Sequence, residues 1–257
     1  MSEARLRLAV SGTYGTGKTT TTEALAIATG LSGTHARTAR ELLAEDFPGK
    51  TLEDLSASEL IRLGLRRLEE RIHHEAAQPG GFVSDGSVIH EWIYGEARMR
   101  FGINPNAGIL RKLVSELAGL PVKPFYKTYM AGYGALVKAR AKRMYDAYVH
   151  LPVEFPLPED GHRPVSERFR HASDALLIET LDALEIPYII IRGSIAQRLS
   201  TIIEHFGLPI AVPIDVAVQT AETRVAQQAA EIRRHAEAAA RDRNRSWWRK
   251  IKYAFRY

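Results

Sequence analysis

The sequence predicts an α/β fold with three layers, in which helices cover both faces of a parallel five-stranded sheet. Two observations favour this class. Short apolar segments alternate with helical patterns along most of the chain, which is the order that parallel strands and their connecting helices require. A glycine-rich segment, residues 12–19, stands between the first expected strand and the first expected helix, where such folds bind phosphate. The 257 residues, 45% of them hydrophobic, suffice for one such domain with an appendage.

Five apolar segments are expected to form the strands. Each is short and apolar, as buried strands of a parallel sheet are. The third, "FVSDGS", ends at Asp85, and the fifth, "PYIIIRG", ends at Gly193. In chain order the expected strands are residues 6–10, a short segment before "THARTARELL", residues 82–85, residues 147–151 and residues 187–193.

Seven segments carry the spacing or the boundary signals of a helix. Gly30, after the first segment, is suited to a left-handed C-cap. The second segment has apolar side chains on one face, and Ser56 with Glu59 forms the pattern of a capping box. Ser173 is expected to cap the fifth segment. The expected helices are residues 18–28, 51–77, 88–100, 125–144, 173–185, 194–207 and 217–240.

The composition excludes several classes of protein. The chain has no cysteine, so disulfides, iron–sulfur clusters and thiolate zinc sites are excluded, and a reducing cytoplasm fits this composition. Because the first strand is expected to begin at residue 6, no signal peptide is expected before it. The longest apolar stretch, which starts at Leu208, is interrupted by Pro213 and Asp215 and is shorter than the roughly 20 residues of a membrane-spanning helix. A cytoplasmic protein, with the membrane surface as an alternative location, is therefore expected.

The chain is expected to divide at residue 215, because its net charge of +5 belongs to the C-terminal part. Residues 1–215 form the expected domain, and residues 216–257 form a helix with a basic aromatic tail. In residues 241–257 seven basic residues accompany one acid, Asp242, so the rest of the chain is about neutral.

The sequence of the tail, "RSWWRKIKYAFRY", predicts an amphipathic helix. Trp247, Trp248 and Ile251 fall on one face of this helix and the cations on another. Three roles stay open for such a helix. It could lie on an anionic membrane surface, bind nucleic acid, or pack on its own domain or on a second subunit of a homodimer.

Residues 12–19 read G-x-x-x-x-G-K-T between a strand and a helix, which is the pattern and the context of a P-loop. The glycines let successive backbone N–H groups converge on phosphate oxygens. Lys18 is expected to reach the β- and γ-phosphates, and the Thr19 hydroxyl is expected to ligate Mg²⁺. The sequence therefore predicts a P-loop NTPase fold that binds ATP or GTP with Mg²⁺. The expected nucleotide-binding residues are Gly12, Thr13, Tyr14, Gly15, Thr16, Gly17, Lys18, Thr19 and Thr20.

Other motifs narrow the class of P-loop protein. The N-K-x-D signature that signalling GTPases use to read guanine is absent from the sequence. Asp85 is followed by Gly86, whereas a hexameric AAA+ motor would carry Asp-Glu at the end of a long apolar strand. The nine histidines show no metal-ligand spacing, so Mg²⁺ on the nucleotide is the one metal expected.

Over residues 6–208 the chain resembles the P-loop kinases of nucleosides, nucleotides and related small molecules. It is most similar to the NadR-like AAA domain family, whose members include ribosylnicotinamide kinase domains. The resemblance rests on five segments. They are "SGTYGTGKTT", "THARTARELL", "FVSDGS", "EDGHRPVSERFRHASD" and "IIIRGSIAQRL".

The resemblance implies roles for residues outside the P-loop. Asp85 would organise Mg²⁺ or accept a proton from a substrate hydroxyl. The proline-rich segment, about residues 152–172, would form a kinase-like lid that brings arginines over the transferring phosphate. The lid candidates are Arg163, Arg168 and Arg170, with Arg163 and Arg168 taken as catalytic. Gly193 and Ser194 would cradle the adenine, whereas taken alone they would be a turn and an N-cap.

The acceptor site is the part that the sequence specifies least. Arg37, Arg40, His90 and Trp92 are candidates, with surface ion pairs or core packing as the alternative for each. Where many nucleotide kinases carry Asp-Arg, this chain has Asp85 followed by Gly86, which weakens the case for an acceptor that already carries a phosphate. The expected function is ATP- and Mg²⁺-dependent phosphoryl transfer to a hydroxyl of a small, nucleoside-like acceptor. The alternatives are a nucleotide-binding regulatory protein on an anionic membrane, and a polynucleotide kinase.

Overall fold

Five parallel strands form the centre of the molecule in the computed structural model, which describes residues 6–48, 50, 55–101, 123–154 and 167–254. Their order across the sheet is β2-β3-β1-β4-β5. This order places β1 between β3 and β4, with Val10 opposite both Asp85 and Val149. The strands are β1 (Arg7–Ser11), β2 (Ser32–Thr34), β3 (Phe82–Asp85), β4 (Ala147–His150) and β5 (Tyr188–Ile190). The predicted fold class is confirmed.

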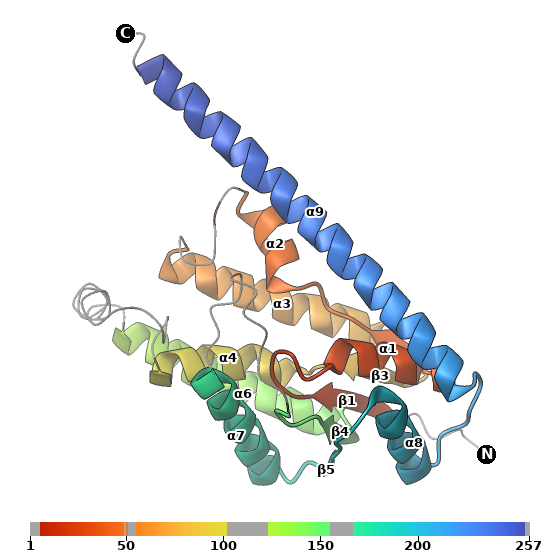
Figure 1. The fold of residues 1–257 in the computed structure, drawn as a ribbon. Helices are drawn as coiled ribbons and strands as arrows, with labels where there is room; N and C mark the ends of the chain where they lie inside the picture. Colours follow the sequence, from red (N-terminus) through yellow and green to blue (C-terminus); the bar gives the residue numbers. More distant parts are fainter. Residues whose placement is uncertain (1–5, 49, 51–54, 102–122, 155–166, 255–257) are drawn as a thin grey trace.

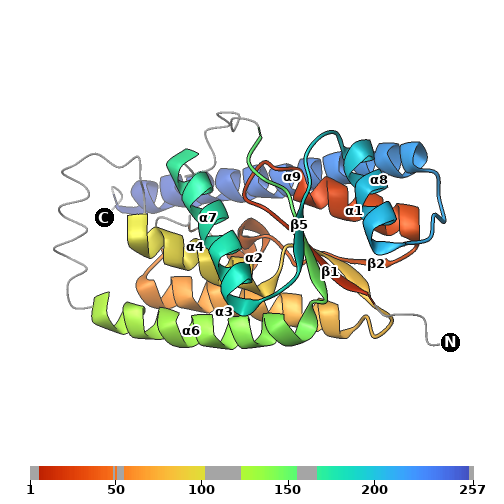
Figure 2. The same cartoon turned by 90° about the horizontal axis from the view of Figure 1, so that it is seen from below.

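Helices cover both faces of this sheet (Figures 1 and 2). Side chains alternate along a strand, so Leu8 and Val10 pack in one core cluster and Ala9 in the other. The helices packed in the cluster of Leu8 are α1 (Lys18–Thr29), α8 (Ile195–Phe206) and α9 (Ile214–Ala254). The helices packed in the cluster of Ala9 are α3 (Ala57–Ala76), α4 (Val88–Phe101), α6 (Lys123–Met144) and α7 (Glu167–Leu184). The short helix α2 (Ala39–Asp46) packs on α3.

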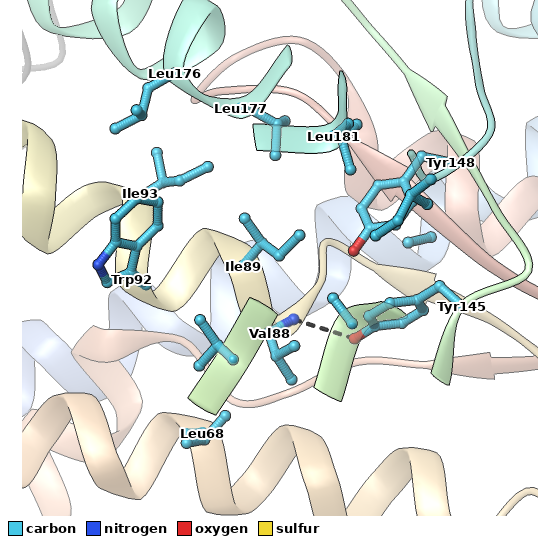
Figure 3. Close-up of a cluster of buried hydrophobic side chains, with 14 of the residues drawn as sticks. Leu68, Val88, Ile89, Trp92, Ile93, Tyr145, Tyr148, Leu176, Leu177 and Leu181 are labelled. Atoms are coloured by element: carbon cyan, nitrogen blue, oxygen red, sulfur yellow. Dashed lines mark hydrogen bonds between the residues drawn. The ribbon is translucent and has the colours of Figure 1, made fainter. Parts of the chain in front are cut away.

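Aromatic and aliphatic side chains form the core cluster between the sheet and α4, α6 and α7 (Figure 3). Ile89 and Ile93 of α4 are almost fully buried there, as is Leu177 of α7. The start of α4 is held by a hydrogen bond from the Val88 N–H to the Tyr145 hydroxyl at 3.1 Å. This bond satisfies one of the N–H groups that a helix leaves without a partner at its N-terminus.

Local signals placed several helix ends correctly, whereas α2 was not among the expected helices. Gly30 is the left-handed C-cap of α1, and Ser56 and Glu59 form the predicted capping box of α3. The prediction for Ser173 was wrong, because α7 begins six residues earlier, at Glu167, and Ser173 lies inside it. Phe169, Ser173 and Leu176 are all buried on one face of α7. The apolar stripe therefore continues upstream of the serine and carries the helix past it.

The C-terminal helix α9 is one continuous helix of 41 residues that begins at Ile214. Ala217 and Ala221 are fully buried against α1. The N–H groups of Ala211 and Val212 both donate to Ala28 O, at 2.7 and 3.2 Å, which fixes the chain just before α9 to the end of α1. Figure 1 shows the C-terminal part of α9 rising away from the body of the molecule. The division of the chain at residue 215 stays a prediction.

None of the helices in the described ranges combines the length and the apolar character that crossing a bilayer requires.

Candidate nucleotide-binding site

The P-loop connects the C-terminal end of β1 to the first turn of α1. Gly12 and Gly17 have φ values of 140° and 85°, which residues with a Cβ atom rarely adopt. Gly17 is the N-cap of α1 and has no side chain to satisfy the first N–H groups of the helix. These groups, together with the positive end of the helix dipole, form a site suited to an anion.

Gly12 is also required by the closeness of its neighbours. A Cβ atom at this position would lie 2.4 Å from Leu151 O and 2.8 Å from Thr16 Oγ1. We expect Gly12→Ala to lower the free energy of unfolding by about 2–4 kcal/mol, because backbone must shift to remove the overlap. Urea denaturation measures this, with Gly132→Ala as the control. Gly132 lies in α6 with nothing within 4 Å of the added atom. Equal stability of Gly12→Ala and wild type would contradict the expectation.

Lys18 and Thr19 begin α1 and lie at the mouth of the loop. The Lys18 ammonium donates to Thr13 O at 2.7 Å, so it lies over the loop backbone. The Thr19 hydroxyl donates to Asp85 Oδ2 at 2.8 Å. Because β1 and β3 are neighbours, their C-terminal ends bring the P-loop and Asp85 together, although Thr19 and Asp85 are 66 positions apart in the chain. The structure therefore assembles the pair that the sequence predicted for the metal.

Asp85 is held in its charged form. Burial alone would raise the pKa of Asp85, but His35, whose Nδ1 lies 3.7 Å from Oδ2, and the charge of Lys18 outweigh it and hold the pKa at about 2. Burial alone would lower the pKa of His35, but Asp85 and Glu23 outweigh it and raise this pKa above its usual value. His35 is a site residue that the sequence analysis did not name.

The donor atoms at this point suit Mg²⁺. A carboxylate and a hydroxyl are hard oxygen ligands, and Mg²⁺ commonly takes one or two carboxylates, with phosphates and waters completing its coordination. Within the described ranges no group of three or more histidines and carboxylates could hold a metal alone. Thr19 and Asp85 are thus the residues that would hold Mg²⁺ brought by a nucleotide.

His90 lies behind the P-loop and is 4% exposed. Its Nδ1 accepts from the Ser87 N–H at 3.0 Å, and its Nε2 lies 3.5 Å from Gly12 N. Burial, with the charges of Lys18 and Arg71, holds the pKa of His90 well below its usual value, so the ring is neutral at physiological pH. Its polar contacts are with Ser87 and with the backbone of the P-loop, and a contact with an acceptor stays a prediction.

Three aromatic rings form a column beside the loop. Tyr14 of the P-loop stacks on Tyr94 of α4 with ring centroids 4.9 Å apart, and Tyr94 stacks on Phe169 of α7 at 6.4 Å. Burial, helped by Tyr14, raises the pKa of Tyr94 well above its usual value and keeps it neutral. The three rings therefore connect the P-loop to α4 and α7, which cover the face of the sheet opposite to α1. The sequence analysis named Tyr14 but missed Phe169.

Arg198 supports the P-loop from α8 and was also missed. Its Nη1 donates to Thr16 O at 2.7 Å and its Nη2 donates to Glu154 at 2.9 Å, and its side chain is 5% exposed. Ser194, at the start of the same helix, forms a capping box with Gln197. This is the N-cap that the sequence allowed for Ser194, and a role of Gly193 and Ser194 at the adenine stays a prediction.

Arg71 and Glu75, buried residues of α3, fix the end of β3. Arg71 donates to Ser84 Oγ and to Asp85 O, at 3.2 and 3.0 Å, and pairs with Glu91. Glu75 accepts from the Ser84 hydroxyl at 3.0 Å. The backbone that carries the Asp85 side chain is therefore held by Arg71, which is itself paired with Glu91. Glu75 holds the neighbouring Ser84.

The remaining candidates are spread over several environments. Arg163 lies outside the described residues. Arg168 is exposed in the first turn of α7, whereas Arg170 is buried and pairs with Glu167 at 2.8 Å. Most of the predicted lid segment lies outside the described residues, so the catalytic roles of Arg163 and Arg168 stay predictions.

The other acceptor candidates mostly have structural partners. Arg37 pairs with Glu45 and with Glu70, the second at 2.6 Å. Arg40 lies in α2, and its side chain is outside the described residues. Trp92 is 6% exposed in the core (Figure 3), and its Nε1–H donates to Met130 O at 3.0 Å. Trp92 therefore packs in the core, which is the alternative to acceptor binding that the sequence analysis gave.

The chain is similar to known proteins in sequence and in fold. A family model described as an AAA domain matches residues 7–198. Deoxyadenosine kinase from M. mycoides with bound dATP is 13% identical and has a TM-score of 0.55, with 79% of this chain and all of that chain covered. NadR protein in complex with NR is 17% identical with a TM-score of 0.50, over 80% of this chain and 53% of that chain. These likenesses show a shared fold. No match was found among curated proteins.

Proposed function

The chain belongs to the AAA domain family, and on that premise we propose that it transfers the terminal phosphate of ATP to a hydroxyl group of a small, nucleoside-like acceptor, with Mg²⁺ as cofactor. The observation that carries the proposal is the hydrogen bond of 2.8 Å between Thr19 at the P-loop and Asp85 at the end of β3. This bond joins a hydroxyl and a carboxylate at the start of α1, the helix that Lys18 also begins.

Each group has a separate task in this proposal. The loop amides and the Lys18 ammonium bind the β- and γ-phosphates and neutralise the charge that develops during transfer. Thr19 and Asp85 hold Mg²⁺, which, when bound, draws charge from the phosphate oxygens and orients them. Arg198 keeps the loop in shape through Thr16. The acceptor is inferred from the fold shared with a deoxyadenosine kinase and with NadR, and GTP remains an alternative donor.

The test is transfer of label from γ-labelled ATP to a panel of nucleosides and nicotinamide riboside by the full chain. Phosphorylation of one acceptor with saturation kinetics supports the proposal. Hydrolysis of ATP without transfer to any acceptor, across the panel, contradicts it. Transfer to the 5′ end of an oligonucleotide, with binding that weakens steeply as salt rises, would instead support a polynucleotide kinase.

A second candidate function is docking on an anionic membrane through the tail. The favouring observation is that the backbone of α9 stays helical through Ala254, since an interfacial amphipathic segment has to be helical. We expect the full chain to float with vesicles that contain phosphatidylserine, and a chain ending at residue 240 to remain unbound. Neutral phosphatidylcholine vesicles are the control. Equal flotation of both chains would contradict a lipid-binding tail.

A further inference from the structure

A line of polar contacts runs from the transfer site to the C-terminal helix. His35 Nδ1 lies 3.7 Å from Asp85 Oδ2, and His35 Nε2 lies 3.1 Å from Glu23 Oε2. The other oxygen of Glu23 accepts from Arg224 of α9 at 2.7 Å. Four elements thus meet in one connected set: the end of β3, the segment after β2, α1 and α9.

Glu23 is the residue that joins this line to the P-loop helix. It stands four positions after Thr19, so both side chains lie on the same face of α1, one turn apart. The carboxylate of Glu23 is 18% exposed and uses one oxygen for each neighbour. Asp85 Oδ2 therefore has two neighbours, the Thr19 hydroxyl and His35 Nδ1. The other ring nitrogen of His35, Nε2, is in contact with Glu23.

We propose that Glu23 and His35 are positioning residues of the transfer site, which hold the Asp85 carboxylate in the orientation that Mg²⁺ requires, and that α9 completes the set through Arg224. The proposal rests on the proposed function for Asp85. Loss of a neighbour that orients a metal ligand typically costs 10–100-fold in metal affinity or activity. The 3.7 Å contact between His35 Nδ1 and Asp85 Oδ2 is an electrostatic contact and not a hydrogen bond, so we expect a loss at the lower end of this range.

Of Glu23, His35 and Arg224, we expect Arg224 of α9 to contribute least. Arg224 is 61% exposed, and an exposed ion pair is weak because solvent screens it. The position of its backbone is nevertheless secure, because Ala217 and Ala221 are fully buried against α1. The helix thus brings a cation to Glu23 without relying on the ion pair to hold the helix there.

The experiment measures ATP affinity by calorimetry with Mg²⁺ and with EDTA, for the wild type and for Glu23→Gln, His35→Gln, Arg224→Gln and Arg224→Lys. We expect the first two variants to lose about tenfold of the affinity gain that Mg²⁺ gives, with affinity in EDTA unchanged. Arg224→Gln should lose about two- to threefold, and Arg224→Lys should recover most of it. Arg233→Gln, an exposed position farther along α9, is the control and should match the wild type.

The outcomes separate this proposal from the proposed function. Wild-type Mg²⁺ dependence in Glu23→Gln and His35→Gln overturns the positioning role, even if the chain phosphorylates a nucleoside. An equal loss with Mg²⁺ and with EDTA also overturns it, because that loss would reflect damage to the P-loop. A selective loss with Mg²⁺ supports it, even if no acceptor is ever phosphorylated by the wild type.

Discussion

Replacement of Lys18 by alanine is expected to lower kcat/KM for phosphoryl transfer by roughly 10²–10³-fold. The ammonium lies at the start of α1 with its Nζ over Thr13 O, where it would meet the terminal phosphates. Charge on the transferred group grows in the transition state, and a cation held nearby stabilises that state more than the bound substrate. We therefore expect kcat to fall as well as kcat/KM.

The matched control for Lys18 is Lys142→Ala. Lys142 is 57% exposed near the end of α6 and pairs with Glu185, so its loss should leave the kinetics unchanged. Steady-state rates with labelled ATP measure both variants, and thermal unfolding confirms that they are folded. If Lys18→Ala retained more than about a third of the wild-type rate, the site proposed for the terminal phosphates would be wrong.

Asp85→Asn should lower kcat by roughly a hundredfold at saturating ATP and raise the Mg²⁺ concentration needed for half-maximal rate. Asparagine keeps the size of the side chain and removes the charge that would bind the cation. Asp182→Asn is the control, because Asp182 is exposed and accepts a hydrogen bond from Tyr188 that asparagine can also accept. Unchanged Mg²⁺ dependence in Asp85→Asn would contradict the assignment.

The low pKa of Asp85 predicts how the stability of the protein changes with pH. The pKa of Asp85 is about 2 in the folded protein and roughly 3.9 in an unfolded chain, so its charge stabilises the fold above about pH 4, and this contribution is lost as the pH falls towards 2. Asp85→Asn should therefore lose less stability than the wild type between pH 4 and pH 2. Parallel urea denaturation at both pH values measures the difference.

Features that depend on local chemistry were predictable from the sequence. The capping box at Ser56, the N-cap at Ser194 and the C-cap at Gly30 follow from a few adjacent residues. The P-loop is set by a motif of eight residues between a strand and a helix, and Asp85 follows from its place at the end of a strand. Local rules failed at Ser173, where the buried face of α7 overrides the preference of serine for a cap.

The contacts that organise the site were not predictable, because they join residues that are remote in the chain. Arg198 reaches Thr16 across 182 positions. Phe169 meets Tyr94 only after α7 and α4 have packed on the same face of the sheet. His35 has no motif of its own and gains its place from the parallel pairing of β2 with β3. Such residues become visible only when the strand order is known.

The single uninterrupted helix at the C-terminus has a mechanical consequence. At 1.5 Å per residue, its 41 residues extend for about 60 Å. Its N-terminal part is seated on α1, where Ala217 and Ala221 are fully buried, so a tilt of α9 would pivot about this end. A tilt of about 5° at the pivot moves the far end by about 5 Å. A displacement of this size is large enough for a distance probe at the C-terminal end of α9 to detect.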